Sequence, residues 1–114
     1  MPAAKYRLMI EQGATHKQMF TIFDGTEKRD LSGYTARMQI RENYDTPVVV
    51  ECTTENGGIT LDANGGLELF ISDTQTAAIP FIKGKYDIEI IEMATGYITR
   101  IIMGDVVNSL EVTK

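Results

Sequence analysis

Apolar and polar residues alternate with a period of two along most of this chain, as they do in strands with one buried face. Residues 34–41 give the clearest example, with four apolar residues on one face and four polar residues on the other. The apolar set, which we expect to fill the core, is Tyr34, Ala36, Met38 and Ile40. The same alternation predicts strands at residues 5–11, 17–23, 48–53, 59–61, 67–71, 85–92, 97–103 and 105–112.

Short turn sequences separate these predicted strands. They are Asp24-Gly25, Ser32-Gly33, Asn56-Gly57-Gly58, Asn64-Gly65-Gly66 and Thr95-Gly96. Tight connections join antiparallel strands, because parallel strands need crossovers of about a dozen residues or more. The pattern therefore predicts an antiparallel sandwich or a small barrel. Residues 42–47 form the longest polar connection and are expected to be an exposed loop.

One segment departs from the strand pattern and predicts a short helix at residues 72–79. Ser72 is a favourable N-cap residue, and Gln75 stands three positions later, as in a capping box. Pro80 then stops the helix. We expect this helix to close one end of the sandwich with Ala77, Ala78 and Ile79.

The length and composition indicate one domain spanning residues 1–114. The longest apolar run, residues 77–82, is far shorter than the roughly 20 residues of a membrane span, so no transmembrane segment is expected. The first seven residues hold no apolar stretch typical of a secretion signal, which favours a protein made and kept in a cytosol. A single cysteine, Cys52, fits that reducing compartment and excludes an internal disulfide.

The charge balance argues against nucleic acid and anionic membranes as partners. Eleven Lys and Arg residues face sixteen Asp and Glu residues, which gives a net charge of −5. Binding to phosphate backbones depends on clustered basic residues, whereas those of this chain are scattered. The densest basic cluster, residues 27–30, is diluted by its own acids.

The inventory of reactive side chains argues against an enzyme. The only histidine, His16, lies in a turn-like sequence, where we expect it to be solvated. Cys52 alternates with Val48 and Val50, which predicts a buried and unreactive thiol. Two such residues cannot supply the three or four ligands of a zinc site, and the sequence holds no nucleotide-binding or calcium-loop motif. We therefore expect no catalytic residue, no cofactor and no bound metal.

Several apolar residues fall on the polar phase of their strands and suggest a contact surface. Phe70 and Ile91 lie opposite the main apolar phase, and residues 97–103 are apolar on both faces. Such a face either binds another chain or is covered by a loop or terminus, and the pattern leaves both open. We expect a terminal segment to join the contact, because edge strands can serve as docking strips. The candidate interface residues are Tyr97, Thr99, Ile101, Met103, Phe70 and Ile91.

A run of twelve residues, 30–41, resembles a signature of small tailed-phage virion proteins. Its sequence DLSGYTARMQIR is similar to the pattern DL(S/T)GYTxRMQIR, found in the N-terminal β-sandwich domains of phage baseplate upper and fibre-anchoring proteins. The likeness extends through residues 10–15, 54–60, 71–79, 84–90 and 99–104. At His16 the family usually has an aromatic residue.

The resemblance implies an all-β, two-sheet antiparallel sandwich of the immunoglobulin-like type, with one short helix. It implies a non-enzymatic part of a phage virion, a tail, baseplate or fibre-adaptor component assembled in the bacterial cytoplasm. Its partners would be other virion proteins, with multiple copies in a symmetric assembly and no contact with nucleic acid or membrane. Two alternatives stay open, a capsid decoration protein and a carbohydrate-binding module on the same sandwich. The absence of Trp counts against the carbohydrate-binding module, because sugar-binding platforms use flat aromatic side chains.

Overall fold

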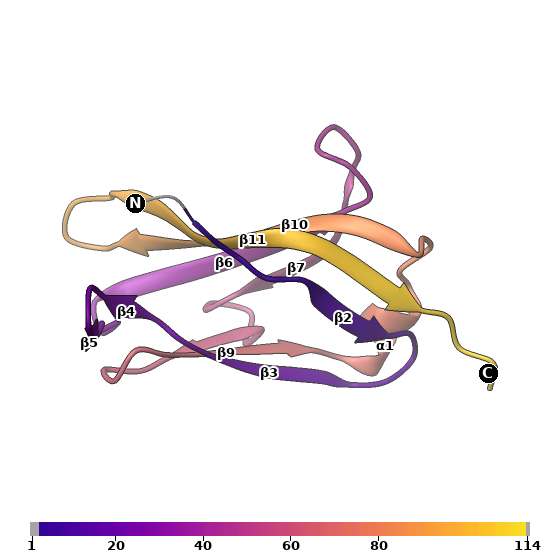
Figure 1. Cartoon of the computed structure of the whole chain (residues 1–114), viewed down its shortest axis with the longest axis horizontal. Helices are drawn as coiled ribbons and strands as arrows, with labels where there is room; N and C mark the ends of the chain where they lie inside the picture. The colour runs from indigo at the N-terminus through magenta and orange to yellow at the C-terminus, as the bar shows by residue number, and fades with distance from the viewer. Residues whose placement is uncertain (1–2, 114) are drawn as a thin grey trace.

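The computed structural model describes residues 3–113 as two β-sheets packed face to face, with one short helix (Figure 1). Sheet 1 contains β1 (Ala4–Lys5), β2 (Leu8–Glu11), β6 (Tyr34–Arg41), β7 (Val48–Thr53), β10 (Lys83–Glu92) and β11 (Ile98–Ser109). Sheet 2 contains β3 (His16–Thr21), β8 (Ile59–Leu61) and β9 (Gly66–Ile71). A small hairpin joins β4 (Phe23–Asp24) to β5 (Glu27–Lys28), and helix α1 spans Asp73–Ala77.

Of the sandwich and the small barrel that the alternation left open, the structure is the sandwich, and it has the two sheets that the resemblance implies. Sheet 1 has the order β1-β11-β10-β6-β7, and sheet 2 has the order β3-β9-β8. One detail differs, because β1 and β2 run parallel to β11 while the other pairs are antiparallel. Parallel strands need a long connection between them, and this requirement is met here. β1 and β2 are the first strands of the described residues and β11 is the last, so the strands between them form the connection.

The core lies between the sheets and contains the expected face of β6. Ala36, Met38 and Ile40 are at most 1% exposed, and they pack with Ile88 and Ile90 of β10 and with the inner side chains of sheet 2. Tyr34 differs from the prediction, because it is only half-buried. It lies at the start of β6, where its hydroxyl accepts a hydrogen bond from Arg29 Nη2 (3.1 Å) and donates one to a Glu92 carboxylate oxygen (3.3 Å).

Helix α1 begins as the sequence predicts. The Ser72 hydroxyl accepts from the backbone N–H of Gln75 (3.2 Å), and the Gln75 side chain accepts from the backbone N–H of Ser72 (2.9 Å), which completes the capping box. Of the three closing residues expected, only Ile79 is buried, and Thr76 takes the place of the two alanines. Ile79 and Thr76 are fully buried, whereas Ala77 and Ala78 are exposed. Thr76 and Ile79 therefore cover this end of the sandwich, and the two alanines between them are exposed.

The predicted strands at 97–103 and 105–112 are a single strand, β11. Gly104 does not mark a turn, because it lies in mid-strand where the link between β1 and β2 passes close to it. The backbone N–H of Tyr6 donates to the Met103 carbonyl (3.0 Å), and a Cβ on residue 104 would overlap the Tyr6 carbonyl. Glycine therefore allows the close approach of a neighbouring backbone, which is a common reason for glycine inside a strand.

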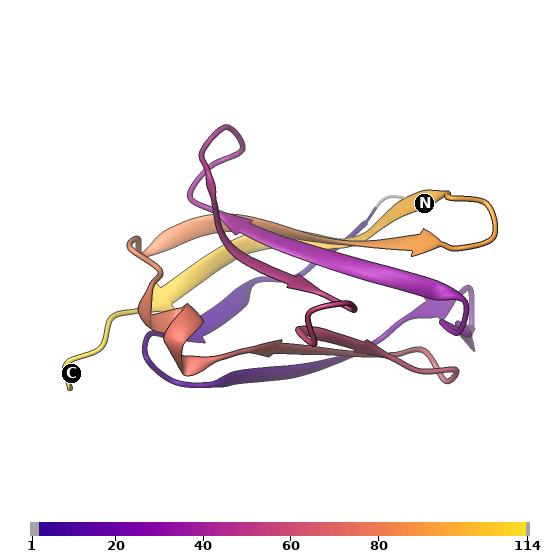
Figure 2. The ribbon, with the colours of Figure 1, turned by 180° about the vertical axis from the view of Figure 1, so that it is seen from behind.

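Residues 42–47 form the expected exposed loop. They connect β6 to β7 and project from sheet 1 at the top of Figures 1 and 2. At the opposite end of β6 the hairpin between β10 and β11 extends along the long axis of the molecule, and α1 lies at the far end (Figure 2). In the described part of the chain, residues 3–113, no helix has the length and apolar character needed to cross a membrane.

Candidate functional site

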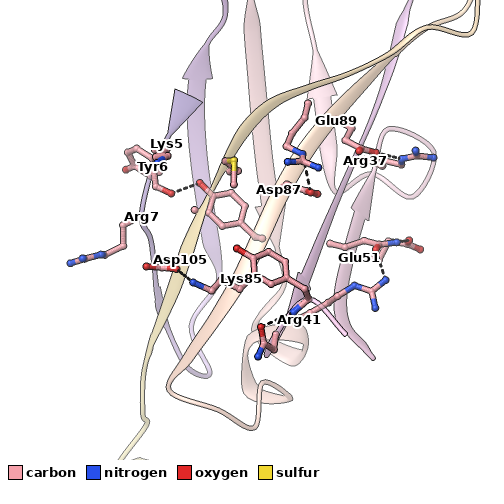
Figure 3. A pocket seen from close by; sticks show the side chains of 17 residues that line it. Lys5, Tyr6, Arg7, Arg37, Arg41, Glu51, Lys85, Asp87, Glu89 and Asp105 are labelled. Carbon is pink, nitrogen blue, oxygen red and sulfur yellow. Dashed lines mark hydrogen bonds and ion pairs between the residues drawn. The ribbon is translucent and has the colours of Figure 1, made fainter. Parts of the chain in front are cut away.

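A broad groove lies on the outer face of sheet 1, the face turned away from the core (Figure 3). Its volume is about 870 Å³, and its floor is formed by the outward side chains of β6, β10 and β11. Residues 5–7 border one side, and the loop residues Asn43 and Tyr44 border the other. The charged residues that line this outer-face groove are Lys5, Arg7, Arg37, Arg41, Glu51, Lys85, Asp87, Glu89, Arg100 and Asp105.

Ion pairs between neighbouring strands organise the floor of the groove. Arg37 of β6 lies directly opposite Glu89 of β10, and Arg37 Nε lies 2.8 Å from a Glu89 carboxylate oxygen. On the other side of β10, Lys85 lies opposite Asp105 of β11, with 2.5 Å between Nζ and the carboxylate. These pairs hold long side chains in fixed positions, although each is partly exposed and individually weak.

A third ion pair crosses the groove diagonally between β10 and β11. Arg100 Nε lies 3.4 Å from an Asp87 carboxylate oxygen. Asp87 is half-buried, and burial together with the charge of Glu89 raises the pKa of its carboxyl despite the opposing effect of Arg100. At the edge of the groove the hydrogen bond to Lys85 lowers the pKa of Asp105. Burial therefore has the largest effect on the pKa at Asp87, and the bond to Lys85 has the largest effect at Asp105.

Arg41 links the groove to the projecting loop. Its Nη1 donates to the Thr46 carbonyl (2.6 Å), and its Nη2 donates to the Gln39 side chain (3.0 Å), which in turn donates to Glu51 (2.8 Å). In the loop, the ring of Tyr44 lies 5.9 Å from Lys85 Nζ, within the range of a cation–π contact. The loop wall is thus attached to the floor of the groove by polar contacts.

The groove concentrates positive charge on an acidic protein. Six of the eleven Lys and Arg residues of the chain line it, together with four of the sixteen Asp and Glu residues. These counts give a local charge of 6 − 4 = +2 and leave 5 − 12 = −7 for the rest of the chain. At physiological ionic strength charges interact over about 8 Å, so a bound partner would experience this local excess more than the net charge.

The two reactive side chains considered from the sequence lie outside the groove. Cys52 is fully buried, as predicted, and burial raises the pKa of its thiol to about 11. His16 is not a solvated turn residue, because it begins β3 and is half-buried. Burial lowers the pKa of His16 more than its hydrogen bond to Gln18 (3.2 Å) raises it. Among residues 3–113, no three His, Cys, Asp or Glu side chains are placed to hold a metal ion.

A β-bulge interrupts the predicted contact strand. Ile88 of β10 lies opposite Ile102, whereas the next residue, Glu89, lies opposite Arg100. Ile101 is therefore an extra residue on β11, and it packs partly against the core. Because strand side chains alternate strictly between faces, one extra residue reverses the alternation beyond it.

The six candidate interface residues consequently do not form one surface. Thr99 lies opposite the buried Ile90, on the side of sheet 1 that carries the core, and is itself exposed, whereas Met103 lies opposite Asp87 and borders the groove. Tyr97 is 75% exposed at the end of the β10–β11 hairpin. Ile91 pairs with Ile98 on the outer face of that hairpin, and Phe70 lies on the outer face of sheet 2.

The groove residues were not among the candidates predicted from the sequence, although the sequence carries one signal of them. Arg37, Gln39 and Arg41 form the polar phase of the clearest predicted strand, and Lys85, Asp87 and Glu89 form the same phase of another. Two strands with alternating charges can form a charged face only if they are neighbours. The order of the strands in the sheet decides which strands are neighbours, and here β6 lies next to β10.

No family model matches the sequence, and no curated protein matches it. Solved structures do share its architecture. A chain from the crystal structure of ICOS in complex with ICOS-L and an anti ICOS-L VNAR domain has 12% sequence identity and a TM-score of 0.52, covering 96% of this chain and 56% of that chain. The chain has an immunoglobulin-like fold.

This immunoglobulin-like chain spans a little over half the length of that structural neighbour. A second neighbour comes from the parallel homodimer structures of the extracellular domains of the voltage-gated sodium channel beta4 subunit. It has 12% identity and a TM-score of 0.38, with 96% of this chain and 97% of that chain covered. Many immunoglobulin domains link their two sheets by a disulfide, whereas here Cys52 is the only cysteine, so the shared core joins the sheets without a disulfide.

Proposed function

We propose that this chain is a structural protein of a tailed-bacteriophage particle, a tail, baseplate or fibre-adaptor component that works through protein contacts. The observation that carries the proposal is the position of residues 30–41, the run that resembles phage virion proteins. Its inward side chains belong to the core, and its outward ones, Arg37, Gln39 and Arg41, line the outer-face groove. The residues that carry the resemblance thus contribute both to the core and to the outer-face groove.

The chemistry of the groove suits a protein partner with an acidic surface. The local excess of two positive charges attracts carboxylates, and Tyr44 and Met103 add apolar area at the rim. Four carboxylates alternate with the basic residues, and they would repel the regularly spaced phosphates of a nucleic acid. A folded protein surface can match such a mixed pattern with its own acids and bases.

The location of the protein can be tested with purified particles of the phage that encodes it. Mass spectrometry should find the chain among the virion proteins, and immunogold labelling should place it on the tail or baseplate. A copy number in the hundreds with labelling of the head would instead indicate the capsid decoration protein. Absence of the chain from purified particles would contradict the proposal.

The contact surface can be tested with one charge reversal and a matched control. Lys5→Glu reverses a charge at the border of the groove, and Lys28→Glu makes the same change in the separate β4–β5 hairpin. Both lysines are exposed in two-residue strands, so both variants should fold normally by circular dichroism. We expect Lys5→Glu to reduce incorporation into particles and Lys28→Glu to leave it unchanged. Equal incorporation of the two variants would place the contact outside the groove.

A further inference from the structure

Strand β3 presents an open edge at the side of sheet 2. It pairs with β9 on one side only, and among residues 3–113 no strand pairs with its other side. The N–H of Ile22 donates to the Gly65 carbonyl (2.8 Å), and hydrogen-bonded pairs recur at every second residue of an antiparallel ladder. Counting back from Ile22 in steps of two, the backbone groups of residues 20, 18 and 16 point toward β9 and bond to it.

Three residues of β3 therefore direct their backbone groups away from β9. These are Lys17, Met19 and Thr21, and each contributes one N–H and one C=O. Their side chains lie on the outer face of sheet 2 and are exposed, with Met19 at 59%. Six backbone groups in a regular row form a template for another strand.

Other strand edges are less available. On β7, the side chain of Asn56 accepts from the Thr53 N–H (2.8 Å) and donates to the Glu51 carbonyl (3.1 Å), so it occupies edge groups that another strand would need. Strand β8 has only three residues. On the far side of β11, the edge is divided between β1 and β2 by the link at Tyr6 and Arg7. The edge of β3 is the longest regular one that stays uncovered in residues 3–113.

We propose that two copies of this chain pair through β3 about a two-fold axis at Met19, joining their two copies of sheet 2 into one continuous sheet. An antiparallel strand pair is compatible with two-fold symmetry, so a single open edge can pair with its own copy. With Met19 opposite Met19 of the second copy, Lys17 lies opposite Thr21 in both halves. All six outward groups of each strand then find partners.

A second copy carries the same six outward groups and so matches this edge group for group, and side-chain charge makes the Met19-centred register the favourable one. A shift that placed the two Lys17 residues opposite each other would bring like charges together, whereas the Met19-centred register avoids it. The charge of Lys17 is also partly balanced within its own chain, since Nζ lies 3.8 Å from a Glu68 carboxylate oxygen. On the outer face the two Met19 side chains meet beside Phe70, which is 39% exposed.

The inner side of the same edge is compatible with the pairing. Tyr6 packs edge-on against Phe20, with 5.3 Å between ring centroids, and its hydroxyl accepts from Gln18 Nε2 (2.6 Å). These three side chains close the gap between the two sheets without using the outward backbone groups of β3. Tyr6 is 44% exposed, and the second copy would cover part of it.

The test compares two equally exposed methionines by sedimentation equilibrium of the full chain. Met19 and Met9 are both 59% exposed, but Met9 lies on β2 in sheet 1. Met19→Lys would place two lysines opposite each other at the two-fold axis and should raise the dimer dissociation constant at least about tenfold. Met9→Lys makes the same change in net charge and should leave the constant unchanged. A monomeric wild-type chain at millimolar concentration, or equal dimerisation of the two variants, would overturn the proposal.

Cysteine cross-linking provides a second measurement, which reports the register of the pair as well as its formation. In the proposed register the two residue-19 Cα atoms form a hydrogen-bonded pair at about 5.5 Å, within the range of about 4.4–6.8 Å for disulfides. Met19→Cys should therefore give a covalent dimer under mild oxidation, and Met9→Cys should stay monomeric. The buried Cys52 does not compete, because its thiol is fully inaccessible. Equal cross-linking at positions 9 and 19 would indicate random collision and would contradict the β3 interface.

Discussion

The Met38→Ala variant is expected to lose about 2–4 kcal/mol of unfolding free energy. Met38 is fully buried in the middle of β6, where it lies opposite Cys52 of β7 on one side and Ile88 of β10 on the other. The truncation removes three heavy atoms beyond Cβ, each worth about 0.8 kcal/mol of apolar burial, or roughly 2 kcal/mol together. The remaining cavity adds to this cost, because strands fixed in ladders on both sides relax only partly.

Arg37→Ala is the matched control, since Arg37 is the preceding residue of β6 and points to the opposite face. Its side chain is 46% exposed, and the ion pair with Glu89 is partly solvated, so its loss should cost less than about 1 kcal/mol. Urea unfolding followed by far-UV circular dichroism measures both variants, and the denaturant slope should stay constant. Similar losses for Met38→Ala and Arg37→Ala would show that the face assignment of β6 is wrong.

Three further variants test individual contacts. Tyr86→Phe removes the hydroxyl that donates to the Tyr6 carbonyl (2.7 Å) and should cost about 1–2 kcal/mol in thermal unfolding, because a partly buried acceptor loses its partner. Gly104→Ala should displace the β1–β2 link, so hydrogen exchange should accelerate at the Tyr6 amide while the β6–β10 ladder keeps its protection. The lowered pKa of His16 means that its contribution to stability is complete above its ordinary value of 6.5 and declines as pH falls below it. His16→Gln should therefore make the urea midpoint depend less on pH between about 7 and 5. If the variant and the wild-type chain show the same dependence, other titrating groups cause it.

The sequence alone was sufficient wherever the determining interactions are local. The period-two alternation of residues 34–41 identified β6 and its buried face, because successive side chains of a strand point to opposite sides. The capping box of Ser72 and Gln75 located the start of α1, since both hydrogen bonds lie within four residues. The buried state of Cys52 followed from its phase relative to Val50, whereas Val48, which the same phase predicts to be buried, is exposed beyond a register shift between β6 and β7.

Tertiary contacts decided the features that depend on residues far apart in the sequence. Residues 97–103 and 105–112 were predicted as two strands, but β11 runs through Gly104 without a turn, and the backbone N–H of Tyr6, about a hundred residues earlier in the chain, bonds to the Met103 carbonyl beside it. The extra residue Ile101 exists only relative to the register with β10, and it separates Thr99 from Met103. No local pattern specifies a register shift, because the shift is defined only by which residue of β10 lies opposite each residue of β11.

The outer-face groove and the open edge of β3 also depend on sheet order. The polar residues of β6 and β10 form one charged floor because the two strands are neighbours, although more than forty residues separate Arg37 from its partner Glu89. β3 has an open edge because β1 and β2 pair with β11 in the other sheet. Alternation determines which side chains of a strand share a face. Only the folded chain determines which strands lie side by side, because that choice depends on the packing of both sheets together.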